Sequence, residues 1–507
     1  MPTIPINPII PGFAPDPSLV RVESDYFLVN STFHLFPGLP IYTSKDLVHW
    51  EHIGNALHRQ SQMSLEHSST KINPDLLATG GLFAPTIRYH NETFYIVCTN
   101  IIHKPDIPGR AENFVISTKD IWAGEWSDPV YFDHDGIDPS LFFDDDGKVY
   151  LQGSHTVRPR VTEINLFEID LTTGKRLSEE KNIWGGTGGK FPEGPHIYKR
   201  DGWYYVLIAE GGTHEGHMIT TARSKDIWGP YEPCPSNPIL TAAGTREYIQ
   251  YVGHCEAFTD PEGNSWGVCL GVRMEKGGRY IMGRETFLTS GEWEEGEWPA
   301  FDTVKMDPKG VVAAQGDGKP RLSARPGVDF LHIRNPELSN YSSLGTDRAV
   351  TITSVSSDLS HPNESPSFIG KRMRYLDGTS SVTIVSPPEG SRVTAGLVVY
   401  KDEHRYLRIF LDTSESRIGF ELVNGYQKLS KSNTQSVEKV TEYHLTIDHT
   451  EKEFRLSYSA GEGSKTTLAV IDTLEMTDPD FVGPVIGAFA VDQGHAVKVE
   501  FRNLEIS

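Results

Sequence analysis

Residues 7–18 read NPIIPGFAPDPS and set Asp16 between two prolines, ahead of an aromatic-aliphatic run at Tyr26–Val29. A run of this composition is typical of a β-strand. The same order, a marked residue followed 10 to 12 residues later by such a strand, occurs five times along the chain. The five leading positions are Asp16, Ala84, Asp138, Glu193 and His254.

These five copies indicate a repeat architecture. Their aromatic runs are spaced by 68, 56, 54 and 62 residues, and a long repeat of short strands and turns is typical of a β-propeller. Blades stack around an axis because one small sheet cannot bury both of its faces. We therefore predict a five-bladed propeller in which the five leading residues surround one central funnel.

Three of the five positions carry carboxylic acids, which are costly to gather because like charges and desolvation both oppose ionisation. Asp16 or Asp138 alone reads equally well as a turn residue beside proline. Carboxylic acids at three equivalent repeat positions favour a functional site over three unrelated turns. Two carboxylates flanking a pocket can cleave a glycosidic bond, one as an acid and the other by activating water or attacking carbon, and a third can raise the pKa of the acid.

Aromatic residues near the predicted funnel are candidates for stacking on sugar faces. They are Phe33, Phe36 and Phe83. Packing between blades is an alternative for all three and explains Phe36 equally well.

Composition limits the class of protein. The chain has 507 residues, too many for one core, and its 47 Gly and 33 Pro suit a turn-rich all-β protein of two domains. The net charge of −21 without a basic cluster argues against a nucleic-acid partner. No apolar run reaches the length of a membrane span, and the four cysteines lack the spacing of a zinc site or a disulfide framework.

The N-terminus lacks the basic and apolar regions of a signal peptide, which predicts a cytoplasmic protein, or a secreted one whose signal has been trimmed. Residues 1–310 carry the propeller pattern, and a Gly/Pro/Ala-rich linker covers 311–327. Alternating strands in 328–507 predict a β-sandwich of the jelly-roll, concanavalin-like type with a supporting or carbohydrate-contacting role.

A second motif recurs at 44–50 (SKDLVHW), 117–122 (STKDIW) and 224–228 (SKDIW). We expect its Asp to form a tight turn and its Trp to pack between blades.

Motifs along the chain resemble glycoside hydrolase family 43. They are 7–50 as a whole, GIDPSLFFDDDGKVYL (136–151), PEGPHIY (192–198), AEGGTHEGH (209–217), YVGHCEAF (251–258) and GRETFL (283–288). Members of this family are inverting β-xylosidases, α-L-arabinofuranosidases and arabinanases on a five-bladed propeller. The C-terminal region resembles the domain appended in the β-xylosidase branch.

The resemblance implies a role for each site residue. Asp16 would be the general base, Glu193 the general acid, and Asp138 the residue that raises the pKa of the acid and orients it. His254 and Arg284 would form the floor of the sugar subsite with Thr213 as a further contact, although from the residues alone His254 reads as an interior histidine. No cofactor is required; the resemblance allows a structural calcium ion near His254, which no ligand cluster in the sequence demands.

The chain departs from the usual xylosidase pattern around the sugar. It has Phe83-Ala84-Pro85 where a Trp-Ala-Pro is usual, a different sequence at 34–38, and an unlike segment at 152–163. These changes leave the choice between xylose and arabinofuranose open.

We therefore predict an inverting, exo-acting hydrolase, monomeric or oligomeric, that releases terminal pentose from xylan or arabinoxylan fragments, with β-xylosidase activity favoured. The alternatives are a strict α-L-arabinofuranosidase on decorated arabinoxylan and a non-catalytic sugar-binding propeller.

Overall fold

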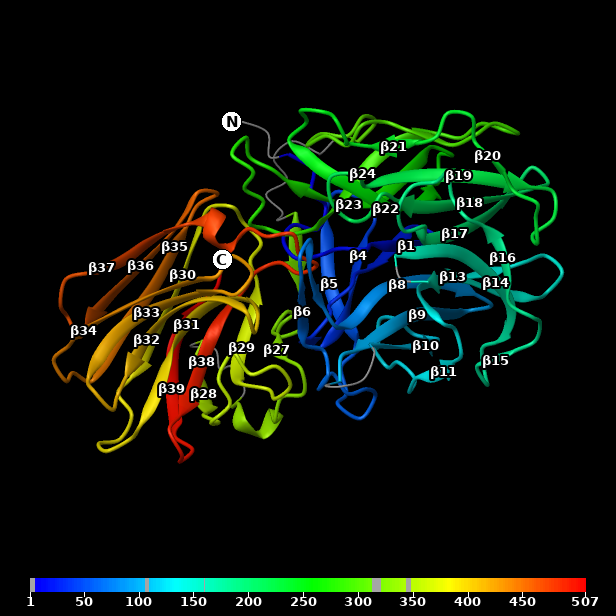
Figure 1. The fold of residues 1–507 in the computed structure, drawn as a ribbon. Coiled ribbons are helices and arrows are strands. Elements are labelled where there is room, and N and C mark those ends of the chain that lie inside the picture. The colour runs from blue at the N-terminus through cyan, green and yellow to red at the C-terminus, as the bar shows by residue number, and fades with distance from the viewer. Residues whose placement is uncertain (1–4, 105–108, 159, 312–320, 343–347) are drawn as a thin grey trace.

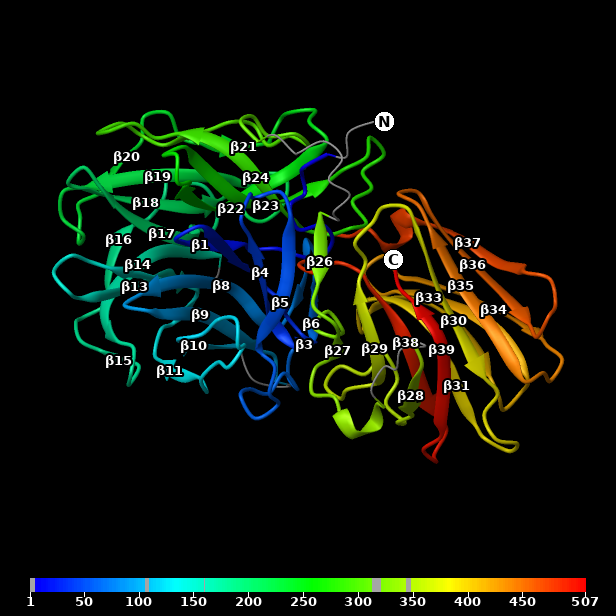
Figure 2. The same cartoon turned by 180° about the vertical axis from the view of Figure 1, so that it is seen from behind.

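The computed structural model describes residues 5–104, 109–158, 160–311, 321–342 and 348–507. Seen from opposite sides in Figures 1 and 2, the chain forms two parts, a ring of small sheets and a pair of larger stacked sheets. Within the described ranges there is no α-helix, only the 3-10 turns η1 (Leu338–Asn340) and η2 (Thr473–Met476). None of the described helices has the length and apolarity needed to cross a lipid bilayer.

Five antiparallel sheets form the blades of the propeller. The first contains β1 (Ser18–Val22), β2 (Asp25–Val29), β4 (Gly38–Ser44) and β5 (Trp50–Leu57); the second β8 (Gly81–His90), β9 (Thr93–Ile102), β10 (Arg110–Thr118) and β11 (Val130–Phe132). The third contains β12 (Gly136–Phe143), β13 (Val149–Arg158), β14 (Val161–Asp170), β15 (Lys175–Arg176) and β16 (Lys181–Trp184). The fourth contains β17 (Glu193–Arg200), β18 (Trp203–Glu210), β19 (Met218–Ser224), β20 (Glu232–Pro233) and β21 (Leu240–Thr241); the fifth β22 (Ile249–Thr259), β23 (Ser265–Arg273), β24 (Glu285–Glu292) and β25 (Ala300–Phe301).

The innermost strands β1, β8, β12, β17 and β22 contact one another in that order, and β22 contacts β1 to close the ring. The repeated Asp-turn motif supports this packing. Asp46 Oδ1 accepts hydrogen bonds from two backbone N–H groups of its turn. Trp122 of the second blade meets Phe27 of the first, and Trp228 of the fourth meets Tyr150 of the third, each edge to face. The predicted turn and inter-blade roles are confirmed at these positions.

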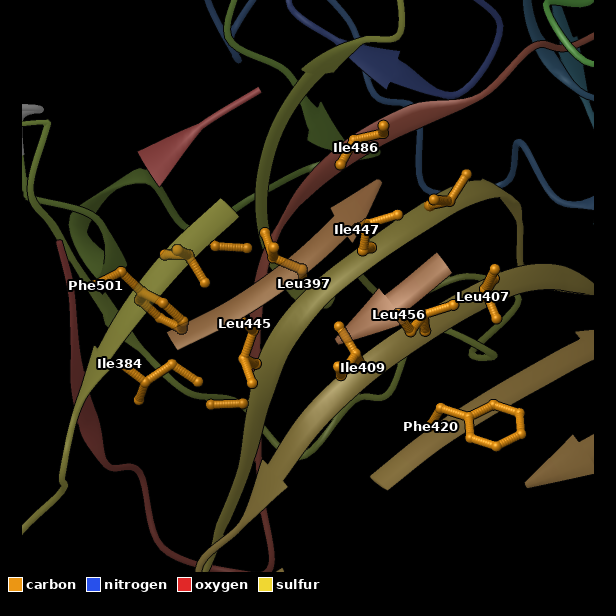
Figure 3. Close-up of a cluster of buried hydrophobic side chains, with 14 of the residues drawn as sticks. Ile384, Leu397, Leu407, Ile409, Phe420, Leu445, Ile447, Leu456, Ile486 and Phe501 are labelled. Atoms are coloured by element: carbon orange, nitrogen blue, oxygen red, sulfur yellow. The ribbon is translucent and has the colours of Figure 1, made fainter. Parts of the chain in front are cut away.

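Two six-stranded sheets form the β-sandwich. One contains β28 (Val350–Thr353), β39 (Lys498–Glu505), β30 (Gly378–Val385), β35 (Glu442–His449), β36 (Glu453–Ala460) and β37 (Thr466–Asp472). The other contains β29 (Ser367–Arg372), β38 (Val485–Asp492), β31 (Val393–Asp402), β32 (Arg405–Asp412), β33 (Arg417–Asn424) and β34 (Leu429–Ser436). Alternate residues of both sheets, including Leu397, Ile409, Leu445, Ile447 and Phe501, meet in a buried core between them (Figure 3). The predicted propeller and sandwich are both confirmed.

The connection between the two parts differs from a plain linker. Residues 312–320 of the predicted linker lie outside the described residues, but β26 (Leu322–Ala324) pairs in parallel with β5 and so extends the first blade. β27 (His332–Ile333), predicted to belong to the sandwich, pairs with β3 (Leu35–Phe36) of the propeller. The segment that leads to the sandwich is therefore paired with propeller strands at two places. Figure 2 shows β26 and β27 between the two parts.

Candidate active site

A pocket of about 1140 Å³ lies at the propeller axis, near the beginning of the inner strands. All five repeat positions line it, which is the arrangement that the repeat predicts. The lining includes Asp16, Ala84, Asp138, Glu193 and His254, together with Phe33, Phe83, Thr213, Arg284 and Phe481.

The backbone explains why these residues face the axis. Asp16, Ala84, Asp138 and His254 have left-handed φ angles of 51°, 36°, 55° and 46°. In the blades of the last three, the antiparallel register shifts at that point, so each is a β-bulge that turns a side chain out of the sheet. In the fourth blade the left-handed residue is Gly194, with φ 56°. Glu193 therefore lies one residue before the position equivalent to Asp16, which corrects the simple repeat alignment.

Asp16 is nearly buried, with 5% of its surface exposed. Ser31 donates to its Oδ2 at 2.6 Å, Arg284 Nη1 donates to its Oδ1 at 3.1 Å, and His254 Nδ1 lies 4.0 Å away. Burial raises the pKa of Asp16, but Arg284, His254 and Ser31 outweigh it, so that the pKa lies below its usual value. Asp16 is therefore ionised at neutral pH, which is the state that its predicted role as general base requires.

The pKa values of the other two carboxyl groups are shifted in the opposite direction, upward. Burial and the nearby charge of Asp16 raise the pKa of Asp138 to about 6, although His254 and a hydrogen bond from Gly194 N at 3.0 Å oppose the shift. Burial, then the charges of Asp138 and Asp16, hold the pKa of Glu193 well above its usual value. The pocket thus holds one carboxyl group with a lowered pKa beside two with raised pKa values, a separation typical of acid and base catalysts.

Arg284 connects this set to the rest of the molecule. Its Nη1 donates both to Asp16 and to Thr213 Oγ1 (3.0 Å), which brings the predicted residues together. Its Nε and Nη2 donate to the carbonyl oxygen of Phe481 at 3.3 and 3.0 Å. Arg284 therefore holds the Asp16 carboxylate in place in addition to lining the predicted sugar subsite.

Two of the three predicted aromatic residues line the pocket, and one does not. Phe33 and Phe83 meet at 4.7 Å between ring centroids. Phe36 is buried in the core with Leu39 and Leu57 and is absent from the pocket lining, because β3, which carries it, turns toward β27. The packing alternative is therefore correct for Phe36.

Phe481, from the sandwich, supplies a wall that the sequence analysis did not identify. Its ring stacks on Phe33 at 5.8 Å and meets Phe83 edge to face at 5.6 Å. The hairpin of β6 (Thr70–Asn73) and β7 (Leu76–Thr79) adds Asn73, Asp75 and Leu76 to the lining. No repeat or motif marks these residues, and Phe481 reaches the pocket only because the chain folds back over 197 positions to Arg284.

The calcium ion that the resemblance allows near His254 has no ready set of side-chain ligands in the described part of the chain. The ring of His254 lies directly beneath Gly194, where a Cβ would approach it to 3.0 Å. Among the described residues no group of three or more His, Cys, Asp or Glu side chains is arranged to hold a metal ion. Calcium takes six to eight oxygen ligands, so a calcium ion near His254 stays a prediction, and no chemical step is assigned to it.

Comparison with known proteins identifies both parts of the chain. A family model described as glycosyl hydrolases family 43 matches residues 5–299, and one described as the beta xylosidase C-terminal concanavalin A-like domain matches 323–507. The non-reducing end alpha-L-arabinofuranosidase BoGH43B of Bacteroides ovatus is 35% identical over 508 residues, covering 97% of this chain and 92% of its own. A xylosidase/arabinosidase of Butyrivibrio fibrisolvens is 36% identical over 440 residues, covering 82% and 81%.

Two solved structures share the whole architecture. Xyloglucan PUL GH43B of Bacteroides ovatus superposes with a TM-score of 0.86 at 33% identity and covers 98% of both chains. The xylan beta-1,4-xylosidase of Bacillus halodurans C-125 has a TM-score of 0.85 at 28% identity and covers 99% of both.

Proposed function

The chain belongs to glycoside hydrolase family 43, and from this premise we propose that it releases single pentose units, with inversion, from the non-reducing ends of xylan and arabinoxylan fragments. The enzymatic assignment removes the non-catalytic sugar-binding propeller as an alternative. The observation that carries the proposal is the trio of carboxyl groups in one pocket, where the surroundings lower the pKa of Asp16 and raise the pKa of Glu193.

The proposed reaction is a single displacement. Glu193 gives its proton to the glycosidic oxygen as the bond from that oxygen to the anomeric carbon breaks. A water molecule forms the new bond to that carbon from the opposite face and loses its proton to Asp16. Asp138, hydrogen-bonded to the backbone beside Glu193, keeps the acid protonated through its charge.

The depth of the site supports exo action. Asp16 and Asp138 are only 5% and 6% exposed, and Phe481 with the β6–β7 hairpin walls the pocket from the sandwich side. A sugar in the middle of a chain would have to thread past these walls, whereas a terminal unit enters directly. The rings of Phe33, Phe83 and Phe481 offer an apolar face for that unit.

We propose β-D-xylose as the better terminal sugar and α-L-arabinofuranose as the second, since the two present similar hydroxyl arrangements. Activity on α-L-arabinofuranose is supported by the Bacteroides ovatus relative that aligns over 97% of the chain, because that relative is named as an arabinofuranosidase.

Initial rates on an aryl β-D-xyloside and an aryl α-L-arabinofuranoside, measured side by side with Asp16→Asn as the blank, test this proposal. We expect both to be hydrolysed, with the higher kcat/KM on the xyloside and neither hydrolysed by the variant. Hydrolysis of the arabinofuranoside alone would establish the strict arabinofuranosidase instead. Failure on both, and on arabinoxylan oligosaccharides, would contradict the proposal.

A further inference from the structure

A cluster of five charged side chains is buried in the sandwich beside the pocket. Lys401 and Asp402 end β31, Arg405 begins β32, and Asp478 and Asp480 lie in the segment 477–484 before β38. None of the five side chains is more than 1% exposed. We call this group the sandwich ion cluster.

Asp480 is the centre of the sandwich ion cluster. Its Oδ2 pairs with both Lys401 Nζ and Arg405 Nη1. Arg405 Nε donates to Asp402 at 3.0 Å, and Lys401 Nζ also donates to the carbonyl oxygen of Met476 at 3.1 Å. Burial raises the pKa of Asp480, yet Arg405 and Lys401 bring it below its usual value, so the carboxylate stays charged inside the protein.

Such a cluster is a poor source of stability, because desolvation of buried charges offsets much of their attraction. Its geometry is the more informative property, since two cations and three carboxylates in mutual contact leave the connecting backbone few alternative positions. The backbone held here is the one that leads into the active site.

Phe481 follows Asp480 directly. Its carbonyl oxygen accepts hydrogen bonds from both Nε and Nη2 of Arg284, and its ring lies against Phe33 and Phe83. One residue before Asp480, the carbonyl oxygen of Pro479 accepts a hydrogen bond from the backbone N–H of Leu77 at 2.9 Å. This bond connects the same segment to the β6–β7 hairpin of the pocket wall. The sandwich ion cluster is thus one residue away from two walls of the pocket.

We propose that Lys401 and Arg405 are positioning residues for the reaction: by fixing Asp480 they hold the Phe481 carbonyl against Arg284, and so hold Arg284 on Asp16. This inference rests on the proposed function for Asp16 as the base. It makes the sandwich a part of the catalytic machinery through a continuous series of contacts.

The series has a definite physical consequence. When the Phe481 carbonyl moves, Arg284 loses the acceptor of two of its donors, and its remaining contacts no longer fix the guanidinium plane. Asp16 then loses part of the positive charge that keeps its pKa low. Since the base must be ionised, the acid limb of the kcat/KM profile moves to higher pH. The other groups that face or contact Asp16 are Ser31, Asp138, Glu193, His217 and His254, and the variants below leave all of them in place.

Two variants test the inference without removing the whole cluster. Asp480→Asn keeps the shape of the side chain but not its charge, and Lys401→Met keeps its length. The matched control is Arg408→Met, which removes another largely buried arginine on β32, one that pairs with Asp358 and Glu421 away from the pocket.

We expect both test variants to lower kcat by about 10-fold, because small misplacements of catalytic groups are expensive, and to move the acid limb upward by about half a pH unit or more. KM should change less than kcat. Arg408→Met should lower the Tm while leaving kcat and the acid limb as in the wild type. Wild-type kcat and acid limb in both test variants, under conditions where they are folded, would overturn the inference.

A second readout does not depend on activity. The amide of Ala14 donates to the carbonyl oxygen of Arg284 at 3.0 Å. Hydrogen exchange of peptides that contain residues 12–16 and 284 should quicken in Asp480→Asn and Lys401→Met but not in Arg408→Met. Unchanged exchange there would overturn the inference even if the wild type hydrolyses neither aryl glycoside, whereas inactivity of the wild type alone bears only on the proposed function.

Discussion

Asp16→Asn lowers kcat by between about 10²- and 10⁴-fold on both aryl glycosides, the contribution expected of a general base. The amide keeps the shape of the carboxylate. Its one oxygen can still accept from Arg284, and its NH2 group can donate to the Ser31 hydroxyl, where the carboxylate now accepts from both residues. It cannot take a proton from water. Because a single displacement forms no covalent intermediate, added azide should restore little activity.

The control for this variant is Asp46→Asn, the same chemical change in an exposed turn of the first blade. It should leave kcat unchanged. Circular dichroism and the Tm show whether Asp16→Asn is folded when it is assayed. A folded Asp16→Asn enzyme that keeps about a tenth or more of the wild-type kcat would remove Asp16 from the role of base.

Glu193→Gln should show a loss that depends on the leaving group. On xylo-oligosaccharides, whose leaving oxygen needs a proton, kcat should fall by about 10²- to 10⁴-fold. On an aryl glycoside with an acidic phenol the loss should be far smaller, because that oxygen departs as an anion. The activated substrate is the internal control, since it reports on folding and on the intact base in the same preparation. Equal losses on both substrates would contradict the assignment of Glu193 as the acid.

The pH profile gives a second view of Glu193. The acid is active while protonated, and burial with the charges of Asp138 and Asp16 holds its pKa well above the usual value. Activity of the wild type is therefore retained through the range where an ordinary glutamate would be ionised, and falls as the pH rises through the shifted pKa. In Glu193→Gln, this basic limb should disappear on the activated substrate.

The propeller was predictable because its signal is local. Each blade repeats a left-handed residue ahead of an aromatic strand within one stretch of sequence, and the same pattern places Asp16, Asp138 and His254 at the axis. The one-residue offset of Glu193 was not predictable, because it depends on Gly194 taking the left-handed position in the fourth blade. Deciding whether Glu193 or Gly194 takes the left-handed position requires the register of β17 against β18.

The walls of the pocket were less predictable, because they depend on contacts between distant segments. Phe33 and Phe36 are three residues apart, yet one lines the pocket and the other packs in the core after β3 pairs with β27. Phe481 reaches Arg284 across 197 positions of the chain. Neither placement leaves a periodic pattern, so neither could be inferred from spacing.

The proposed reaction is a single displacement by Asp16 and Glu193 on a terminal pentose. Proton NMR of the first sugar released from an aryl β-D-xyloside, recorded before the anomers equilibrate, tests it most directly. We expect α-D-xylose as the initial product, because water attacks from the face opposite the leaving group. Initial release of β-D-xylose would mean retention and a covalent intermediate, and would rule out the single displacement.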